Sequence, residues 1–225
     1  MLDDLKMIHE RDAQDALGVV AKQWQQLVYD FGLDCKTNRT ITNVVIGGMG
    51  GSALAASLLS SWPKLKVPLQ IVRNYDLPDY ASESTLFIAS SYSGNTEETL
   101  SALKQAEQAG CEIAVIASGG ELEKIAGDKN YPLFKIPSGF QPRMAVLYNF
   151  AALIQLFESM ELIAGGSVEE LNKTADWLST NTLDWGADIP TSKNKAKELA
   201  LEIVGKSVVI YSGPLFAPVG YKWKI

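Results

Sequence analysis

Two short stretches rich in Gly, Ser and Asn constrain the fold of this chain most strongly. Residues 44–52 read VVIGGMGGS, and residues 91–96 read SYSGNT after a second apolar run. Each stretch follows a predicted strand and precedes a segment with helical spacing. Unpaired backbone N–H groups and the positive end of the helix dipole converge at such a strand–turn–helix junction. The two stretches therefore predict one phosphate site built from two loops of a single sheet.

Strands and helices are predicted to alternate through the first two thirds of the chain. Apolar runs predict strands at residues 43–46, 68–72, 85–90, 112–117 and 132–136, and helical spacing falls at 52–61, 96–109 and 121–126. This alternation predicts an α/β fold, a doubly wound parallel sheet of five strands with helices on both faces. Ligands bind such sheets beyond the carboxyl ends of the strands. Both glycine turns, and a third at residues 118–120, fall at that edge.

Helical spacing also predicts an N-terminal helix over 4–32, a long apolar helix over 144–164, and further helices from 167 and over 192–204. Residues 207–211 (SVVIY) then read as a new buried strand, followed by a small-residue turn and a helix. One strand and one helix cannot bury their own faces. The pattern therefore predicts the beginning of a second α/β domain that stops at Ile225.

Composition and charge limit the function classes. The chain has 225 residues, is 47% hydrophobic and carries a formal net charge of −6, which argues against nucleic acid or an anionic membrane surface as the main partner. No apolar stretch approaches the roughly 20 residues of a membrane helix, and no signal peptide is evident. Cys35 and Cys111 lie far apart without metal-ligand spacing, so we expect reduced thiols in a cytoplasmic protein.

The hydroxyl side chains of the two turns carry the strongest functional signal. Ser52 closes the first turn, and the second holds Ser91, Ser93 and Thr96. A single Ser or Thr at the start of a helix is a routine N-cap. Three hydroxyls within six residues, beside a second glycine turn, exceed what capping requires and favour phosphate binding. The lysine of a P-loop and the Gly-x-Gly-x-x-Gly pattern are missing, which disfavours a nucleotide.

Two further candidates stay open from position alone. Arg143 lies between Pro142 and the long apolar helix, where it either stabilises an oxyanion near the phosphate or is simply exposed. Glu97 and Glu98 either act near the sugar or are solvated glutamates that favour the helix N-terminus through its dipole.

Several motifs together resemble the bifunctional phosphoglucose/phosphomannose isomerases, a family of the sugar isomerase (SIS) domain superfamily. They are residues 47–52, 91–99, 117–120, the triplet Gln141-Pro142-Arg143, and 213–224. The serine motif marks the superfamily, and the Gln-Pro-Arg triplet points to this family. The resemblance, from about residue 40 onward, implies a SIS domain with flavodoxin-like strand order. The division that follows is 1–36, an N-terminal helical segment; 37–165, the first SIS domain; 166–204, linking helices; and 205–225, an incomplete second SIS domain.

The resemblance implies a reversible aldose–ketose isomerisation of glucose 6-phosphate or mannose 6-phosphate to fructose 6-phosphate through an enediol. It implies no metal, no organic cofactor and a homodimer. The residue that would steady the enediolate is Arg143. The positions that would hold the phosphate are Gly50, Gly51, Ser52, Ser91, Ser93 and Thr96.

The chain also departs from the family pattern. The family's catalytic base is a glutamate shortly after the segment that matches residues 221–224, and a histidine and a lysine follow further on; none is matched before Ile225. Glu202 and His9 do not match them. We therefore expect an isomerase lineage whose 225 residues hold the phosphate site, lack the base and are inactive alone. The alternative is a non-catalytic SIS-type sugar-phosphate binding module.

Overall fold

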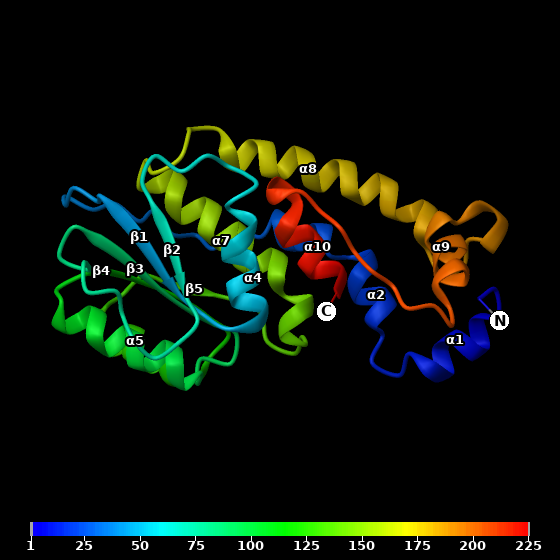
Figure 1. Cartoon of the computed structure of the whole chain (residues 1–225), viewed down its shortest axis with the longest axis horizontal. Coiled ribbons are helices and arrows are strands. Elements are labelled where there is room, and N and C mark those ends of the chain that lie inside the picture. The colour runs from blue at the N-terminus through cyan, green and yellow to red at the C-terminus, as the bar shows by residue number, and fades with distance from the viewer. Residues whose placement is uncertain (1, 225) are drawn as a thin grey trace.

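The computed structural model describes residues 2–224 and has a parallel β-sheet at its centre (Figure 1). Within these residues the sheet has five strands in the order β2-β1-β3-β4-β5. They are β1 (Asn43–Gly47), β2 (Leu69–Val72), β3 (Thr85–Ser91), β4 (Glu112–Ala117) and β5 (Leu133–Lys135). All seven residues of the central strand β3 are buried, as expected for a parallel strand covered on both faces. The predicted fold class is confirmed.

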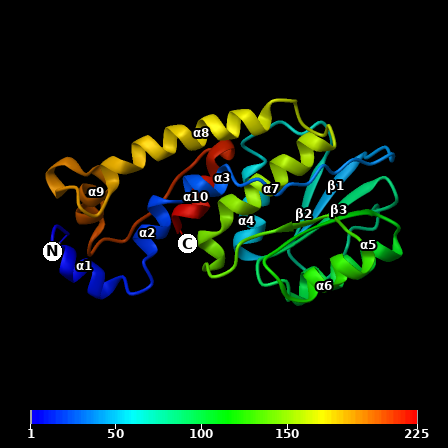
Figure 2. The ribbon, with the colours of Figure 1, turned by 180° about the vertical axis from the view of Figure 1, so that it is seen from behind.

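Helices cover both faces of the sheet. On one face lie α4 (Gly50–Leu58) and α7 (Val146–Ser159), and on the other α5 (Glu97–Gln108) and α6 (Gly120–Lys129) (Figures 1 and 2). Buried alanines at 53, 55 and 56 let α4 lie close to the sheet. The chain leaves β1 towards β2 and returns to place β3 on the other side of β1, so the strand order reverses between β1 and β3. The loops after these two strands therefore open at the topological switch point.

The N-terminal prediction of one helix over 4–32 is wrong. The segment forms three short helices, α1 (Leu5–Arg11), α2 (Ala16–Ala21) and α3 (Trp24–Leu27). The Asp12 carboxylate accepts the backbone N–H groups of Ala16 and Leu17 at 2.8 Å each, and Asp15 has a φ of 51°. Asp12 therefore begins a new helix, because a side-chain acceptor competes with the helical backbone. Of the three, α3 packs firmly on α7 and α8 (Ser167–Asn181).

The long apolar helix is shorter than predicted at both ends. A 3-10 turn, η1 (Pro142–Met144), precedes α7. The helix ends at Ser159, where Glu161 adopts a φ of 57° and the N–H of Leu162 donates to the carbonyl of Phe157 at 2.8 Å. A left-handed residue after the last turn stops a helix even when the sequence remains apolar.

The C-terminal segments lead away from the sheet and then back. Helix α8 runs out from the sheet, and α9 (Lys195–Ile203) lies beside α1 at the far end (Figures 1 and 2). Three 3-10 turns, η2 (Thr182–Trp185), η3 (Thr191–Lys193) and η4 (Pro214–Phe216), precede the last helix, α10 (Ala217–Lys224). The carboxylate of Asp3 accepts the Lys197 ammonium at 3.0 Å and the Thr191 N–H at 2.9 Å, and these bonds lower the pKa of Asp3.

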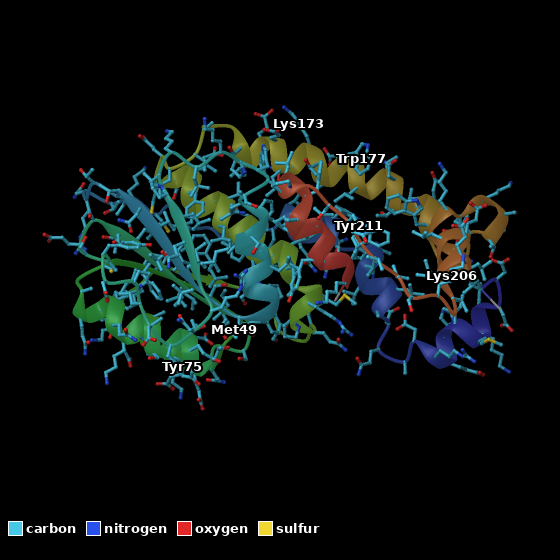
Figure 3. The ribbon with its side chains drawn as sticks, in the orientation of Figure 1. Met49, Tyr75, Lys173, Trp177, Lys206 and Tyr211 are labelled. Atoms are coloured by element: carbon cyan, nitrogen blue, oxygen red, sulfur yellow. The ribbon has the colours of Figure 1, made fainter. Side chains whose placement is uncertain are left out.

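The strand predicted at 207–211 is not part of the sheet. This segment joins α9 to α10, pairs with no strand of residues 2–224 and is exposed, with Tyr211 91% accessible. Figure 3 labels Lys206 and Tyr211 along it. A strand without a neighbour has no ladder of hydrogen bonds to form. The second domain therefore stays a prediction.

Candidate functional site at the switch point

Two loops leave adjacent strands at the carboxyl edge of the sheet. The first connects β1 to α4 through Gly48 and Met49, and the second connects β3 to α5 through residues 92–96. The strands pair in parallel, with Gly47 opposite Ala89, so both loops open at the same edge. In Figure 3, Met49 lies at the start of α4, and Tyr75, from the loop after β2, lies at this same edge. Two helix N-termini therefore face one region.

The backbones of these loops approach too closely for side chains. A Cβ on Gly48 would lie 2.9 Å from the carbonyl oxygen of Ser90, which places the first loop against the end of β3. A Cβ on Gly94, whose φ is +72°, would overlap the carbonyl oxygen of Gly119 in the third turn. A Cβ on Gly120, with a φ of +74°, would overlap the carbonyl oxygen of Ser93. Gly94 and Gly120 therefore allow both a left-handed backbone and a close contact, whereas Gly48 allows the close contact alone.

A residue not singled out from the sequence joins the second and third turns. The side-chain oxygen of Asn95 accepts the backbone N–H of Glu121 at 2.9 Å, in the first turn of α6. The carbonyl of Gly94 accepts the N–H of Leu122 at 3.0 Å. The only sequence signal for this role is an Asn in a turn, a position where Asn commonly bonds nearby backbone. These two hydrogen bonds fix the second turn against the start of α6.

Three predicted hydroxyls come together in the second turn. The Ser91 Oγ lies 2.7 Å from the Thr96 Oγ1 and 3.4 Å from the Ser93 Oγ. Ser91 also accepts the N–H of Gly94 at 3.2 Å, and Ser93 accepts the N–H of Asn95 at 3.3 Å. Three hydroxyls within contact of one another form a compact set of donors that can rotate towards an anion.

Capping does not explain Thr96. Thr96 is the residue that precedes α5, yet its side chain accepts no hydrogen bond from the helix. Within residues 2–224, the backbone N–H groups of Glu97 and Glu98 likewise have no acceptor. Ordinary capping would pair the Thr hydroxyl with one of the first N–H groups of the helix. The N-terminus of α5 is therefore open to an external acceptor.

The N-terminus of α4 is open in the same way. Met49 precedes the helix and supplies no side-chain cap, and the N–H groups of Gly50 and Gly51 have no acceptor in the described part of the chain. Ser52 is 5% exposed, and a Cβ placed on Gly48 would lie 3.4 Å from the Ser52 Cβ. Ser52 thus lies next to the loop that touches the end of β3. The structure brings the predicted glycines and hydroxyls to one edge.

The backbone around Arg143 packs on the first loop. A Cβ on Gly51 would lie 2.8 Å from the carbonyl oxygen of Pro142 and 3.5 Å from the amide nitrogen of Arg143. The Arg143 side chain is exposed and forms no ion pair within residues 2–224. Its guanidinium therefore remains available to an anionic ligand. From position alone, Arg143 is open between stabilising an oxyanion near the phosphate and being simply exposed. The structure adds the backbone contact of this loop with Gly51.

Glu97 faces the loop that follows β2. Its carboxylate accepts the Tyr75 hydroxyl at 3.3 Å, and the charges of Glu98 and Glu97 raise the pKa of that tyrosine. The side chain of Gln105 holds the same loop, donating to the Tyr75 carbonyl at 2.6 Å and accepting the Leu77 N–H at 3.1 Å. Glu97 therefore has a hydrogen-bond partner within the protein, the Tyr75 hydroxyl.

A pocket of about 570 Å³ adjoins the first loop. It is lined by Met49, Gly50, Leu54, Ser57, Arg73, Ala217, Pro218 and Tyr221. Arg73, at the end of β2, donates to the Ser57 Oγ at 3.0 Å. The sequence singled out neither residue, because their proximity depends on the β1–α4–β2 crossover and on the docking of α10. The pocket offers mostly apolar walls and one guanidinium beside the Gly50 end of α4.

The two cysteines are buried free thiols, and burial raises the pKa of both Cys35 and Cys111. A raised pKa disfavours the reactive thiolate. Among residues 2–224, no three or more His, Cys, Asp or Glu side chains group as a metal site requires. No helix in that range has both the length and the apolar character needed to cross a bilayer.

Comparison with known proteins identifies related sequences. No family model matches the chain. The bifunctional phosphoglucose/phosphomannose isomerase of Caldicellulosiruptor bescii is 40% identical over 83% of this chain and 56% of its own length. The protein of the same name from Thermoplasma acidophilum is 36% identical over 82% and 54%. A D-glucosamine-6-phosphate 4-epimerase of Sulfolobus acidocaldarius is 30% identical over 91% and 63%.

Solved structures share the fold at lower identity. The C-terminal domain of glucosamine-fructose-6-phosphate aminotransferase from Francisella tularensis aligns with a TM-score of 0.62 at 12% identity, over 92% of this chain and 62% of that one. Tagatose-6-phosphate ketose/aldose isomerase from Escherichia coli aligns with a TM-score of 0.51 at 19% identity, over 77% and 48%. The chain spans about half the length of the isomerases it matches in sequence. The resemblance stated from the motifs is confirmed, and the chain is related to the bifunctional phosphoglucose/phosphomannose isomerases.

Proposed function

We propose that this chain binds the phosphate of a sugar 6-phosphate and forms part of an enzyme that interconverts glucose 6-phosphate or mannose 6-phosphate with fructose 6-phosphate. The observation that carries the proposal is the cluster of the Ser91, Ser93 and Thr96 hydroxyls, in which Thr96 does not cap α5. It lies at the switch point, beside the open N-terminus of α4. The names of the sequence relatives support the same class of ligand.

In this proposal the phosphate lies between the N-termini of α4 and α5. The N–H groups of Gly50 and Gly51 donate to it from α4, together with the Ser52 hydroxyl. The hydroxyls of Ser91, Ser93 and Thr96 donate from the other side. Such charge-assisted bonds are shorter and stronger than neutral ones, and both helix dipoles favour the anion. The net charge of −6 does not oppose this, because local donors dominate at close range.

The proposed chemistry is a proton transfer between C2 and C1 of the open-chain sugar. A base removes the C2 proton of the aldose and returns it to C1, while the O2 proton passes to O1. The reaction runs through an enediolate whose negative charge must be stabilised. We assign that stabilisation to Arg143, whose side chain is exposed and whose backbone lies against Gly51. We place the base in the part of the relatives that this chain does not match. In this proposal that part belongs to a second SIS domain, which begins near residue 205. The whole enzyme would be a cytoplasmic homodimer.

A non-catalytic sugar-phosphate binding module is the alternative, and a coupled isomerase assay separates the two. We expect the 225-residue chain to bind fructose 6-phosphate without measurable turnover, because the base is assigned elsewhere. Turnover by this chain would contradict that assignment. Turnover in a longer protein that also contains a second SIS domain would exclude the non-catalytic alternative.

Ligand protection tests the proposed binding itself. At a fructose 6-phosphate concentration of 100 times Kd, linkage predicts a stabilisation of about 2.7 kcal/mol. For a protein of this size that raises Tm by roughly 5–10 °C. Fructose is the matched control, since it lacks only the phosphate, and should leave Tm unchanged. Equal shifts with fructose and fructose 6-phosphate would argue against a phosphate pocket.

A further inference from the structure

Helix α10 is docked on α4, the helix that follows the first loop (Gly48 and Met49), which is the phosphate loop of the proposed function. It packs against α4, and Figures 1 and 2 show the two helices side by side. At the far end of α4, the Ser61 hydroxyl bonds the carbonyl of Leu215, in the turn before α10. Pro218 is buried in this contact. These contacts return the C-terminal segment, which leaves the sheet through α8 and α9, to the edge that carries the candidate site.

One side chain of α10 reaches the loop that carries Arg143. The Lys222 ammonium donates to the backbone carbonyl of Arg143 at 2.6 Å. Burial lowers the pKa of Lys222, and the nearby charge of Arg143 lowers it further. An ammonium placed beside another cation and partly removed from water is costly unless its hydrogen bond compensates. The contact joins residues 79 positions apart in the sequence.

The Arg143 carbonyl that accepts the Lys222 hydrogen bond belongs to η1, a turn that lies between α10 and Gly51. Pro142 and Arg143 form the turn η1, and their backbone meets Gly51, with 2.8 Å between the Pro142 oxygen and a Cβ placed on that glycine. The next carbonyl, that of Met144, is held from the N-terminal segment by the Gln26 side chain at 2.8 Å. Within residues 2–224, Lys222 supplies the hydrogen bond to the Arg143 carbonyl.

We propose that Lys222 is a positioning residue that fixes the backbone of the Gln141–Arg143 loop against Gly51 and so couples the C-terminal segment to the sugar-phosphate site. The contact stands on the structure alone, and only the identity of the ligand rests on the proposed function. Loss of this bond frees the η1 backbone at one end. The Arg143 guanidinium is then no longer held at a fixed position relative to the N–H groups of α4. Lys222 itself does not touch the ligand.

Hydrogen exchange of the ligand-free chain tests the coupling. In η1 and directly after it, the N–H of Met144 donates to Gln141 and that of Ala145 to Pro142. With Lys222→Met, which keeps the aliphatic stem and removes the donor, we expect both amides to exchange about fivefold faster, since the lost bond involves a charged donor on a partly exposed side chain. Lys222→Arg should restore slow exchange. Lys224→Met on the same helix is the matched control and should change nothing.

Calorimetric titration with fructose 6-phosphate gives the second readout. We expect affinity to fall about fivefold with Lys222→Met, in line with the loosened loop, and to return with Lys222→Arg. Unchanged exchange at Met144 and Ala145 in Lys222→Met would overturn the proposal whatever the affinity, because a charge effect on the ligand alone would leave the free loop unaltered. Faster exchange in a chain that does not bind the sugar phosphate would support the positioning role and contradict the proposed function.

Discussion

Gly94→Ala is expected to destabilise this chain by about 2–5 kcal/mol, the largest effect of any single substitution considered for the site. The left-handed φ of +72° costs an alanine roughly 1–2 kcal/mol. The added methyl also overlaps the Gly119 carbonyl, and forcing two backbones apart costs about 1–3 kcal/mol more. Urea denaturation of both proteins measures the difference in the free energy of unfolding.

Gly110→Ala separates the two contributions. Gly110 has a φ of +71°, almost the same as Gly94, but a Cβ there meets nothing within 4 Å. Its substitution should therefore cost only the backbone strain, about 1–2 kcal/mol. Equal losses for the two variants would show that the contact between the second and third turns contributes nothing. Fructose 6-phosphate affinity should fall in Gly94→Ala and stay unchanged in Gly110→Ala.

Thr96→Val is expected to weaken fructose 6-phosphate binding at least tenfold, with only a small loss of stability. Valine keeps the shape of threonine and removes the hydroxyl. A hydrogen bond to a charged group contributes about 1.5–3 kcal/mol, which corresponds to at least a tenfold change in Kd. The Thr96 side chain does not cap α5, so the free energy of unfolding should fall only by the roughly 0.5–1 kcal/mol of its hydrogen bond to Ser91, whose hydroxyl keeps Ser93 and Gly94 as partners. Calorimetry and denaturation measure the two quantities separately.

A capping role would give the opposite pattern for Thr96→Val. Loss of an N-cap costs roughly 1 kcal/mol of stability and leaves ligand affinity alone. Thr174→Val is a suitable control, because Thr174 is exposed on α8 and its hydroxyl bonds only the Glu170 carbonyl within residues 2–224. That control should preserve affinity. A stability loss without an affinity loss in Thr96→Val would contradict the assignment of Thr96 to the phosphate.

Much of the sheet could be predicted from the sequence because its signals are local. Each strand is an apolar run that ends in small polar residues, and the carboxyl ends of parallel strands share an edge. The turns after β1, β3 and β4 were located from this pattern alone. The division of residues 4–32 into three helices was not predicted. Asp12 and Asp15 interrupt the segment through side-chain and backbone geometry that helical spacing does not record.

The contacts that connect the site could not be read from spacing. Lys222 meets the Arg143 carbonyl, and Arg73 meets Ser57, only after separate segments have folded together. The segment 207–211 has the composition of a buried strand but lies exposed, since strand propensity depends on a partner. The hydroxyls of the second turn were predicted because they lie within six residues of one another. That the Thr96 hydroxyl does not cap α5 could be seen only in the structure.

The most direct test of the central claim is a crystal structure of this chain with fructose 6-phosphate bound. We expect the phosphate between the N-termini of α4 and α5, with its oxygens within hydrogen-bond distance of the Ser91 and Thr96 hydroxyls and of the Gly51 N–H. Inorganic phosphate at high concentration should occupy the same position. A phosphate bound elsewhere, for example beside Arg73, with the hydroxyl cluster left free, would contradict this expectation.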